Sequence, residues 1–354
     1  MTSVVGRGSN RAQLAGVLLV ALAMAAVSCS SAGQRAHGSA DSASSSPSRD
    51  GVRQVATTVG SPPLRATLTL PAATGPFAVV VFMSGSGPND QDETLGPDKP
   101  FRDLALGLAA DGIATLRYDK RTRDYPHALN PATFTAVDEY VPDALAAIAY
   151  LRRQPGIDPH RIIVLGHSQG GTFAPLVAQR SPALAGVILL AASVEPFGAA
   201  LLRQTRYLAT LPGAIGSQAA AALPRVEVTV GQLDGPSLAQ DPPDTVLAGG
   251  VGPAYYLSLE HVDPVATARA IPQPLLILQG DRDYEVTVPD DLDVWIHGLA
   301  GRPQVTVHQF PAADHLFIDG TGPASPADQD TPAHIDPEVT AVIATWVHAL
   351  RGTS

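Results

Sequence analysis

Cysteine is nearly absent from this 354-residue chain, which contains a single one, Cys29. A lone cysteine excludes an internal disulfide. Basic clusters are also missing, because 23 Lys and Arg residues are outnumbered by 33 Asp and Glu residues, giving a formal charge of −10. The electrostatic footprint of a nucleic-acid-binding protein is therefore lacking, and no nucleic-acid partner is expected. The ten histidines do not fall into ligand spacings such as H-E-x-x-H, and no solenoid-like repeat is visible, so no metal site is predicted.

The first 28 residues are organised like an export signal. Arg7 and Arg11 form a positive region, and the apolar run 14–27 that follows is too short to span a bilayer comfortably. Small residues then precede Cys29, an arrangement that resembles the lipobox of bacterial lipoproteins, in which this cysteine is lipidated. We therefore expect residues 1–28 to be a lipoprotein-type signal peptide, with Cys29 anchoring the protein to the outer face of the bacterial cell membrane. The alternative is an ordinary secretory signal with an incidental cysteine.

The composition changes near residue 52. Residues 29–51 are rich in Ser, Ala and Gly and are expected to form a flexible tether. Residues 52–351 alternate short apolar runs with helical segments, which predicts an α/β domain with a mostly parallel central sheet and helices on both faces. The predicted strands cover residues 66–70 (an edge strand), 77–83, 112–118, 161–165, 185–192, 274–279 and 304–310. The predicted helices cover residues 99–110, 137–153 and 340–351, with a further helix directly after residue 168.

One interval departs from this alternation. Residues 194–272 separate two predicted strands, and a structureless loop of about 80 residues is uncommon in a compact domain. We expect a helical cap insertion here, lying over the carboxyl edge of the sheet, with residues 197–208 as its clearest helix. The alternative is a surface decoration remote from any functional site.

The most informative stretch is residues 160–172, HRIIVLGHSQGGT. A buried apolar strand runs into Gly166-His167-Ser168-Gln169-Gly170, and a helix-compatible segment follows at once. In a G-x-S-x-G elbow the flanking glycines are needed, because a Cβ there would collide with the neighbouring strand or helix. The pattern predicts an exposed Ser168 hydroxyl at the carboxyl end of the sheet. A plain glycine-rich turn is the alternative.

A serine hydroxyl is a weak nucleophile unless a base takes its proton and an acid orients that base. Two loops that follow predicted strands offer such groups. The loop GDRDYEV, residues 280–286, holds three carboxylates, and the loop PAADHLF, residues 311–317, holds His315. Both loops lie at the sheet edge that is expected to carry Ser168.

The elbow and these two loops, in this order, resemble the α/β-hydrolase superfamily, over about residues 52–351. The stretches SGSGPND (84–90) and RYDKR (117–121) are more narrowly similar to secreted bacterial proteins of the dienelactone-hydrolase-like and acyl-esterase-like kind. The resemblance implies an α/β-hydrolase fold.

The resemblance also implies a catalytic triad of Ser168, Asp283 and His315. In such enzymes the acid commonly lies in G-x-x-D-x-x-V, which matches Asp283 in this chain. Asp281 is the alternative acid, and Glu285 is expected to be a solvated loop charge.

The negative oxygen of an acyl-transfer intermediate needs fixed hydrogen-bond donors. By position these are the backbone N–H of Gln169, directly after the nucleophile, and one N–H from the loop after residue 83. The superfamily usually has His-Gly-x in that loop, and this chain has Ser84-Gly85-Ser86. The match points to Ser86 as the second oxyanion-hole donor, with Gly85 and Gly87 as alternatives.

Other polar residues near these motifs receive structural interpretations. His167 is expected to be a packed residue of the elbow. Tyr118, Asp119 and Arg121 are interpreted as a buried ion-pair network, and the alternative is a patch that faces an anionic substrate.

These inferences predict a serine hydrolase that cleaves carboxylic esters of small molecules through an acyl-enzyme intermediate, with no cofactor and with membrane contact only through Cys29. Amides and thioesters stay open as substrates, because the same groups serve any acyl transfer. A non-catalytic, tethered binding protein on a hydrolase scaffold is the remaining alternative.

Overall fold

The computed structural model describes residues 51–233 and 238–350. The predicted signal peptide, Cys29 and the tether up to residue 50 lie outside the described residues. Within the described ranges, no helix combines the length and the apolar character that crossing a bilayer requires.

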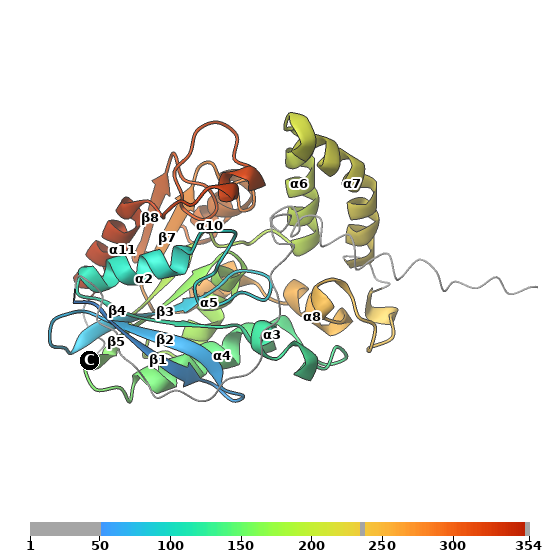
Figure 1. The fold of residues 1–354 in the computed structure, drawn as a ribbon. Helices are drawn as coiled ribbons and strands as arrows, with labels where there is room; N and C mark the ends of the chain where they lie inside the picture. Colours follow the sequence, from blue (N-terminus) through green and yellow to red (C-terminus); the bar gives the residue numbers. More distant parts are fainter. Residues whose placement is uncertain (1–50, 234–237, 351–354) are drawn as a thin grey trace, which may run out of the picture. The chain divides into compact units, whose positions relative to one another are not determined.

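One sheet of eight strands organises the main part of the chain, in the order β1-β2-β4-β3-β5-β6-β7-β8 (Figure 1). Neighbouring strands are parallel from β4 to β8, whereas β2 pairs antiparallel with both β1 and β4. The predicted mostly parallel sheet is confirmed. The strands are β1 (Arg53–Val59), β2 (Leu64–Leu70), β3 (Phe77–Met83), β4 (Ala114–Tyr118), β5 (Ile157–His167), β6 (Gly186–Leu190), β7 (Leu275–Gly280) and β8 (Val305–Phe310).

The prediction that residues 66–70 form an edge strand is wrong. They belong to β2, which lies between β4 and β1, so that β1 forms the edge. The two strands pair from Arg53 opposite Leu70 to Val59 opposite Leu64. Most side chains of β1 (RQVATTV) are exposed or half-buried, so this strand lacks the continuous apolar run that marks the central strands.

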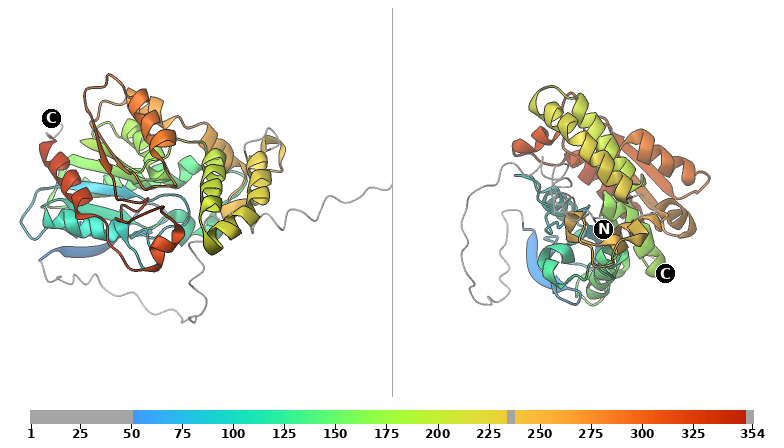
Figure 2. Two further views of the ribbon diagram at one scale, coloured as in Figure 1. Left: turned by 90° about the horizontal axis from the view of Figure 1, so that it is seen from above. Right: turned by 90° about the vertical axis from the view of Figure 1, so that its right-hand side faces the viewer.

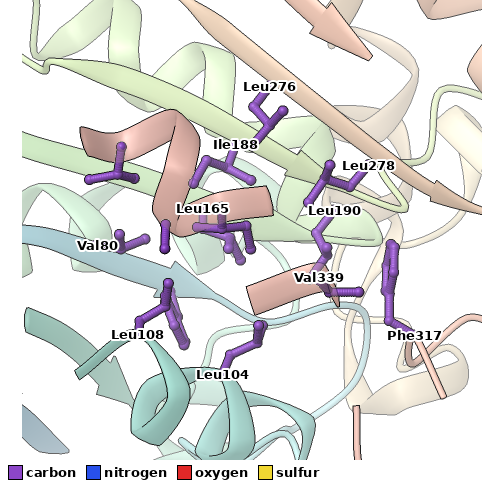
Figure 3. Close-up of a cluster of buried hydrophobic side chains, with 14 of the residues drawn as sticks. Val80, Leu104, Leu108, Leu165, Ile188, Leu190, Leu276, Leu278, Phe317 and Val339 are labelled. Atoms are coloured by element: carbon purple, nitrogen blue, oxygen red, sulfur yellow. The ribbon is translucent and has the colours of Figure 1, made fainter. Parts of the chain in front are cut away.

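Helices α2 (Pro100–Ala110) and α11 (Pro337–Ala349) cover one face of the sheet. Figure 3 shows the core that forms there, with side chains from four adjacent strands packed against both helices. The core includes Val80, Leu165, Ile188 and Leu276 of the strands, Leu104 and Leu108 of α2, and Val339 of α11. Each fully buried aliphatic side chain contributes roughly 1.5–3 kcal/mol, so this layer holds the strand ends in fixed positions.

Helices α4 (Ala136–Leu151) and α5 (Gln169–Arg180) lie on the opposite face (Figures 1 and 2). Side chains alternate between the two faces of a strand, and the residues of β3 that point away from α2, such as Val79 and Val81, are also buried. Helices α4 and α5 pack together through the rings of Tyr140 and Phe173, which stack with their centroids 4.6 Å apart. The prediction of helices on both faces is therefore confirmed.

Helix α11 begins three residues earlier than predicted, because Asp336 caps it by accepting a hydrogen bond from the Glu338 N–H at 2.8 Å.

The remaining helical elements are short. The short elements are α3 (Arg121–Asp124), η2 (Pro126–Ala128), η3 (Leu238–Gln240), η4 (Ala248–Gly250), η5 (Val288–Leu292), α10 (Asp293–Gly298) and η6 (Pro326–Asp330).

A second compact unit includes Ala128–Ala136 and Pro196–His261. Its helices are α6 (Phe197–Thr210), α7 (Gly213–Leu233) and α8 (Pro253–Glu260). Phe134 stacks on Tyr255 with the ring centroids 6.1 Å apart, which joins the short segment to the long one. Helix α9 (Pro264–Ala270), which falls within the predicted insertion, belongs instead to the unit that contains the sheet. The location of the insertion over the sheet edge stays a prediction.

Candidate active site

Ser168 occupies the corner between β5 and α5 with φ 52° and ψ −125°. A positive φ is unfavourable for a residue with a side chain, at a cost of about 1–3 kcal/mol, and persists only where neighbouring groups hold it. Here the Ser168 N–H donates to the Leu190 carbonyl at 2.9 Å, and its own carbonyl accepts from the Gly171 N–H at 2.9 Å. These contacts hold a half-buried serine side chain at the carboxyl end of β5.

The two glycines that flank Ser168 are required by close backbone contacts. A Cβ on Gly166 would lie 2.3 Å from the Gly170 carbonyl oxygen. A Cβ on Gly170 would lie 2.4 Å from the carbonyl oxygen of Met83, at the end of β3. The elbow pattern in the sequence thus reflects the tight crossing of β5, α5 and β3.

Asp283 and His315 come from the loops after β7 and β8, and the fold brings them together. His315 Nδ1 lies 2.7 Å from Asp283 Oδ2, and the two residues are 7% and 6% exposed. A carboxylate only accepts hydrogen bonds, so Nδ1 carries a proton in either protonation state, and whenever the ring is neutral Nε2 keeps its lone pair. Asp281 is exposed and accepts a hydrogen bond from the Gln309 amide at 2.9 Å. The contact with His315 therefore favours Asp283 over Asp281 as the acid.

The Asp283 carboxylate is held by its own loop. Oδ1 accepts hydrogen bonds from the backbone N–H groups of Glu285 and Val286 at 2.8 and 2.9 Å. Oδ2 accepts a longer bond from the Gln279 amide at 3.3 Å, in addition to the bond from His315. With both oxygens engaged, the carboxylate orients the imidazole ring and does not rotate.

Glu285 is more than the solvated loop charge that was expected. Its side chain is 31% exposed, and its Oε2 lies 3.9 Å from His315 Nε2. Burial lowers the pKa of His315, but the charges of Asp283 and Glu285 outweigh burial and leave this pKa above its ordinary value. The site therefore favours the imidazolium, the form that a base reaches after it accepts a proton.

His167 connects the elbow to the His315 loop. Its side chain is buried, as expected for a packed elbow residue, and its ring centroid lies 4.7 Å from that of His315. His167 Nε2 lies 2.9 Å from the His315 carbonyl oxygen, and Nδ1 lies 3.0 Å from Glu93 Oε1. The residue next to Ser168 in sequence is thus in contact with the backbone of His315.

The loop after β3 passes directly against Ser168. A Cβ on Gly85 would lie 3.0 Å from the Ser168 Cβ and 3.5 Å from its Oγ. The Gly85 N–H donates to Glu93 Oε1 at 2.5 Å, so it is already engaged and does not suit an oxyanion donor. The Ser86 N–H, by contrast, has no hydrogen-bond acceptor among the residues that the structure describes. Gln169, directly after Ser168, lies at the first position of α5.

The RYDKR stretch forms a network of ion pairs, as interpreted from the sequence. Arg121 makes two hydrogen bonds to Asp143, at 2.7 and 2.6 Å. Asp119 lies 2.7 Å from an Arg65 nitrogen. Tyr118 is buried, and burial raises the pKa of its hydroxyl. These partners leave the alternative of a substrate-facing patch without support.

Three polar residues near the site were missed by sequence reasoning: Glu93, Lys120 and Tyr140. Lys120 lies within RYDKR, two residues after the end of β4, a position that could have drawn attention to it. Glu93 lies in a loop without a motif, and Tyr140 is one aromatic residue in an amphipathic helix, so neither carried a signal. Across the described part of the chain, no group of three or more His, Cys, Asp or Glu side chains is arranged to hold a metal ion.

Comparisons with known proteins agree with this architecture. Residues 80–324 match the model of the alpha/beta hydrolase family. The chain is 37% identical over 281 residues to Esterase EstD of Thermotoga maritima, and the match covers 79% of this chain. It covers 64% of EstD, so the chain spans just under two thirds of the length of that relative.

Similar solved structures share the fold at low sequence identity. An esterase of Pyrobaculum calidifontis matches with a TM-score of 0.55 and 16% identity, covering 98% of this chain and 95% of that one. A puromycin-hydrolyzing peptidase of Mycobacterium tuberculosis matches with a TM-score of 0.53 and 17% identity, covering 87% of this chain and 41% of that one. At these identities the likeness concerns the fold alone.

Proposed function

The chain belongs to the α/β hydrolase family, and on this premise we propose that it is a serine esterase that cleaves small carboxylic esters through an acyl-enzyme. The proposed catalytic residues are Ser168 as nucleophile, His315 as base and Asp283 as the acid that orients the base. The backbone N–H groups of Gln169 and Ser86 are the proposed oxyanion donors.

The observation that carries this proposal is the strained backbone of Ser168. Ser168 has a φ of 52° at a strand-to-helix corner, a conformation that costs stability in a residue with a side chain. Backbone strain of this kind clusters at active sites. The buried pair of His315 and Asp283 adds support, because its loop contacts His167, the residue beside the nucleophile.

The proposed reaction follows from the hydrogen bond between Asp283 and His315. Because Nδ1 donates to Asp283, Nε2 accepts the Ser168 proton as Oγ attacks the ester carbonyl carbon. The carbon–alkoxy bond then breaks, and the imidazolium gives its proton to the leaving alcohol. Water then attacks the carbonyl carbon of the acyl-enzyme while His315 accepts a proton from it. The imidazolium gives this proton to Ser168 Oγ as the acyl–serine bond breaks, which releases the acid and restores Ser168.

The ester is preferred over other acyl substrates because of the similarity to Esterase EstD. The triad itself does not distinguish esters from amides or thioesters, since all three pass through a tetrahedral oxyanion. A tethered, non-catalytic binding protein is disfavoured, because a scaffold without turnover has no need for the strain at Ser168.

The test is hydrolysis of nitrophenyl esters of increasing acyl length by the purified chain, with Ser168→Ala as the matched variant. We expect turnover by the wild type and at least a 1,000-fold loss in the variant, because the nucleophile is removed. Retained activity in a folded Ser168→Ala protein would overturn the assignment. Turnover of peptide amides or thioesters without turnover of esters would replace the esterase with one of those alternatives, and no turnover of any of the three would favour the binding protein.

We also propose that the protein is exported and held at the outer face of a bacterial membrane by a lipid on Cys29. The support is the sequence around Cys29, which lies outside the described residues. Expression of the full chain in a bacterial host, followed by detergent phase partitioning, tests this proposal. We expect wild type in the detergent phase and Cys29→Ala in the aqueous phase, whereas equal partitioning of both would indicate an ordinary secretory signal.

A further inference from the structure

Lysine is rare in this chain, which has only Lys99 and Lys120, and Lys120 is buried at the end of β4. Its ammonium group lies 2.8 Å from the Gly85 carbonyl oxygen, 2.8 Å from the Tyr140 hydroxyl and 3.1 Å from Glu139 Oε1. It also lies 4.2 Å from the centroid of the Tyr140 ring. Burial of an ammonium group is costly unless it is paired and hydrogen-bonded, so all three of its donors are committed to specific neighbours.

The acceptor that these contacts share is the carbonyl of Gly85. Besides the bond from Lys120, it accepts from the Tyr140 hydroxyl at 2.9 Å and from the Asn89 amide at 3.1 Å. The N–H of the same residue donates to Glu93 at 2.5 Å. Side chains from three separate segments therefore fix both polar groups of Gly85, the residue that touches Ser168.

The Gly85 carbonyl and the Ser86 N–H belong to one peptide unit. That unit is planar and trans, so the N–H points opposite to the carbonyl. Because Lys120, Tyr140 and Asn89 hold the carbonyl, they also set the direction of the Ser86 N–H, which has no acceptor within the described chain. A cation on the carbonyl further polarises the peptide and strengthens its N–H as a donor.

Tyr140 extends this arrangement to the other proposed donor. Its hydroxyl also lies 2.9 Å from the side-chain oxygen Oε1 of Gln169, the residue that follows the nucleophile, so its single proton is shared between this oxygen and the Gly85 carbonyl. The buried group of Lys120 and Tyr140 thus contacts both backbone segments that flank Ser168.

We propose that Lys120, assisted by Tyr140, is a positioning residue of the oxyanion hole, which aims and polarises the Ser86 N–H through the Gly85 carbonyl. This inference rests on the proposed serine esterase function. Lys120 does not touch the substrate, and its effect is confined to the charge that develops in the tetrahedral intermediate.

The test compares Lys120→Met with wild type in ester hydrolysis and inhibitor binding. Methionine retains the apolar stem and removes the ammonium. We expect kcat to fall about 10–100-fold with KM nearly unchanged. Removal of a direct oxyanion donor lowers kcat about 100–1,000-fold, and Lys120 acts only indirectly, through the Gly85 carbonyl. The affinity for an alkyl trifluoromethyl ketone, which forms an oxyanion with the nucleophile, should fall by a similar factor.

Two further variants keep the result interpretable. Lys99→Met removes the other lysine, which pairs with Asp92 at 3.2 Å, and should retain wild-type kcat. Tyr140→Phe keeps the stacked ring and loses the hydroxyl, and should lower kcat and trifluoromethyl ketone affinity about three- to tenfold. If Lys120→Met does not fold, the Tyr140→Phe variant decides the matter by the same two measurements.

The outcome also separates this inference from the proposed function. If wild type hydrolyses esters and Ser168→Ala does not, the esterase assignment stands. The positioning role is then overturned if folded Lys120→Met keeps both the wild-type kcat and the wild-type affinity for the trifluoromethyl ketone. If Lys120→Met does not fold, the same result for Tyr140→Phe overturns it. If Ser168→Ala remains active, the esterase mechanism fails and the positioning role fails with it.

Discussion

Replacement of Glu285 by glutamine should move the pH profile of the proposed enzyme to lower pH. The carboxylate lies 3.9 Å from His315 Nε2, the atom that must be unprotonated to act as base. Its negative charge stabilises the imidazolium and contributes to the raised pKa of His315. Glutamine retains the size of the side chain and removes the charge, so the pKa should fall.

The size of the shift follows from the distance and the exposure. Two unit charges about 4 Å apart interact by about 1 kcal/mol in water and about 4 kcal/mol at an effective dielectric constant of 20. Because the Glu285 side chain is 31% exposed, we take the lower part of this range. A loss of about 1.4 kcal/mol corresponds to about one pKa unit.

The assay is kcat/KM for a nitrophenyl ester across pH, which reports the pKa of the base in the free enzyme. The base works when it is neutral, so activity rises as pH rises through the His315 pKa, and we expect this rise in wild type above the ordinary value of 6.5. In Glu285→Gln the rise should lie about one unit lower. Asp281→Asn is the matched control, because it removes an exposed charge from the same loop and should leave the profile unchanged.

Other ionisable groups face His315 and stay in place in both variants: Asp283, Glu93, Asp314 and His167. A profile that does not move in Glu285→Gln would refute the electrostatic argument. An equal shift in Asp281→Asn would mean that the net charge of the loop, and not the 3.9 Å contact, controls the base.

Two further predictions concern stability. Gly166→Ala places a Cβ 2.3 Å from the Gly170 carbonyl oxygen and should lower the free energy of unfolding by about 3 kcal/mol. Gly231→Ala, in open space on α7, is the control and should not lower it. Urea unfolding measures the free energy of both variants. Burial raises the pKa of Asp314 from 3.8 to about 6, so the folded state loses stability as pH rises from about 4 to 6. Asp314→Asn keeps an acceptor for the Leu316 and Ile318 N–H groups. This variant should raise the melting temperature at pH 8 but not at pH 4. Equal effects at both pH values would contradict the explanation.

The sequence by itself was sufficient for the elements whose signals are local. A central parallel strand is buried on both faces and must be apolar along its length, so the central strands could be recognised one by one. The elbow around Ser168 is also recognisable from its own segment, although only Gly166 is dictated by a contact within that segment, and Gly170 is dictated by Met83 at the end of β3. Strand β1 was missed, since a polar, half-exposed edge strand carries no such signal.

Only the tertiary structure decided which groups meet. Asp281 and Asp283 lie in the same loop, where only the match to the G-x-x-D-x-x-V pattern favoured Asp283, and the structure separates them by burial and by the contact with His315. Glu285 was misjudged for the same reason, because the distance from a carboxylate to an imidazole depends on the packing of two loops.

The support for the proposed oxyanion hole depends on the fold in the same way. Lys120 and Tyr140 lie 35 and 55 residues from Gly85 in the chain and reach it because β3 lies between β4 and β5 in the sheet, whereas Glu93 belongs to the same loop as Gly85. Local sequence determines where a strand ends and which backbone turns sharply. The order of strands determines which side chains reach the ends of their neighbours, and no single segment contains that information.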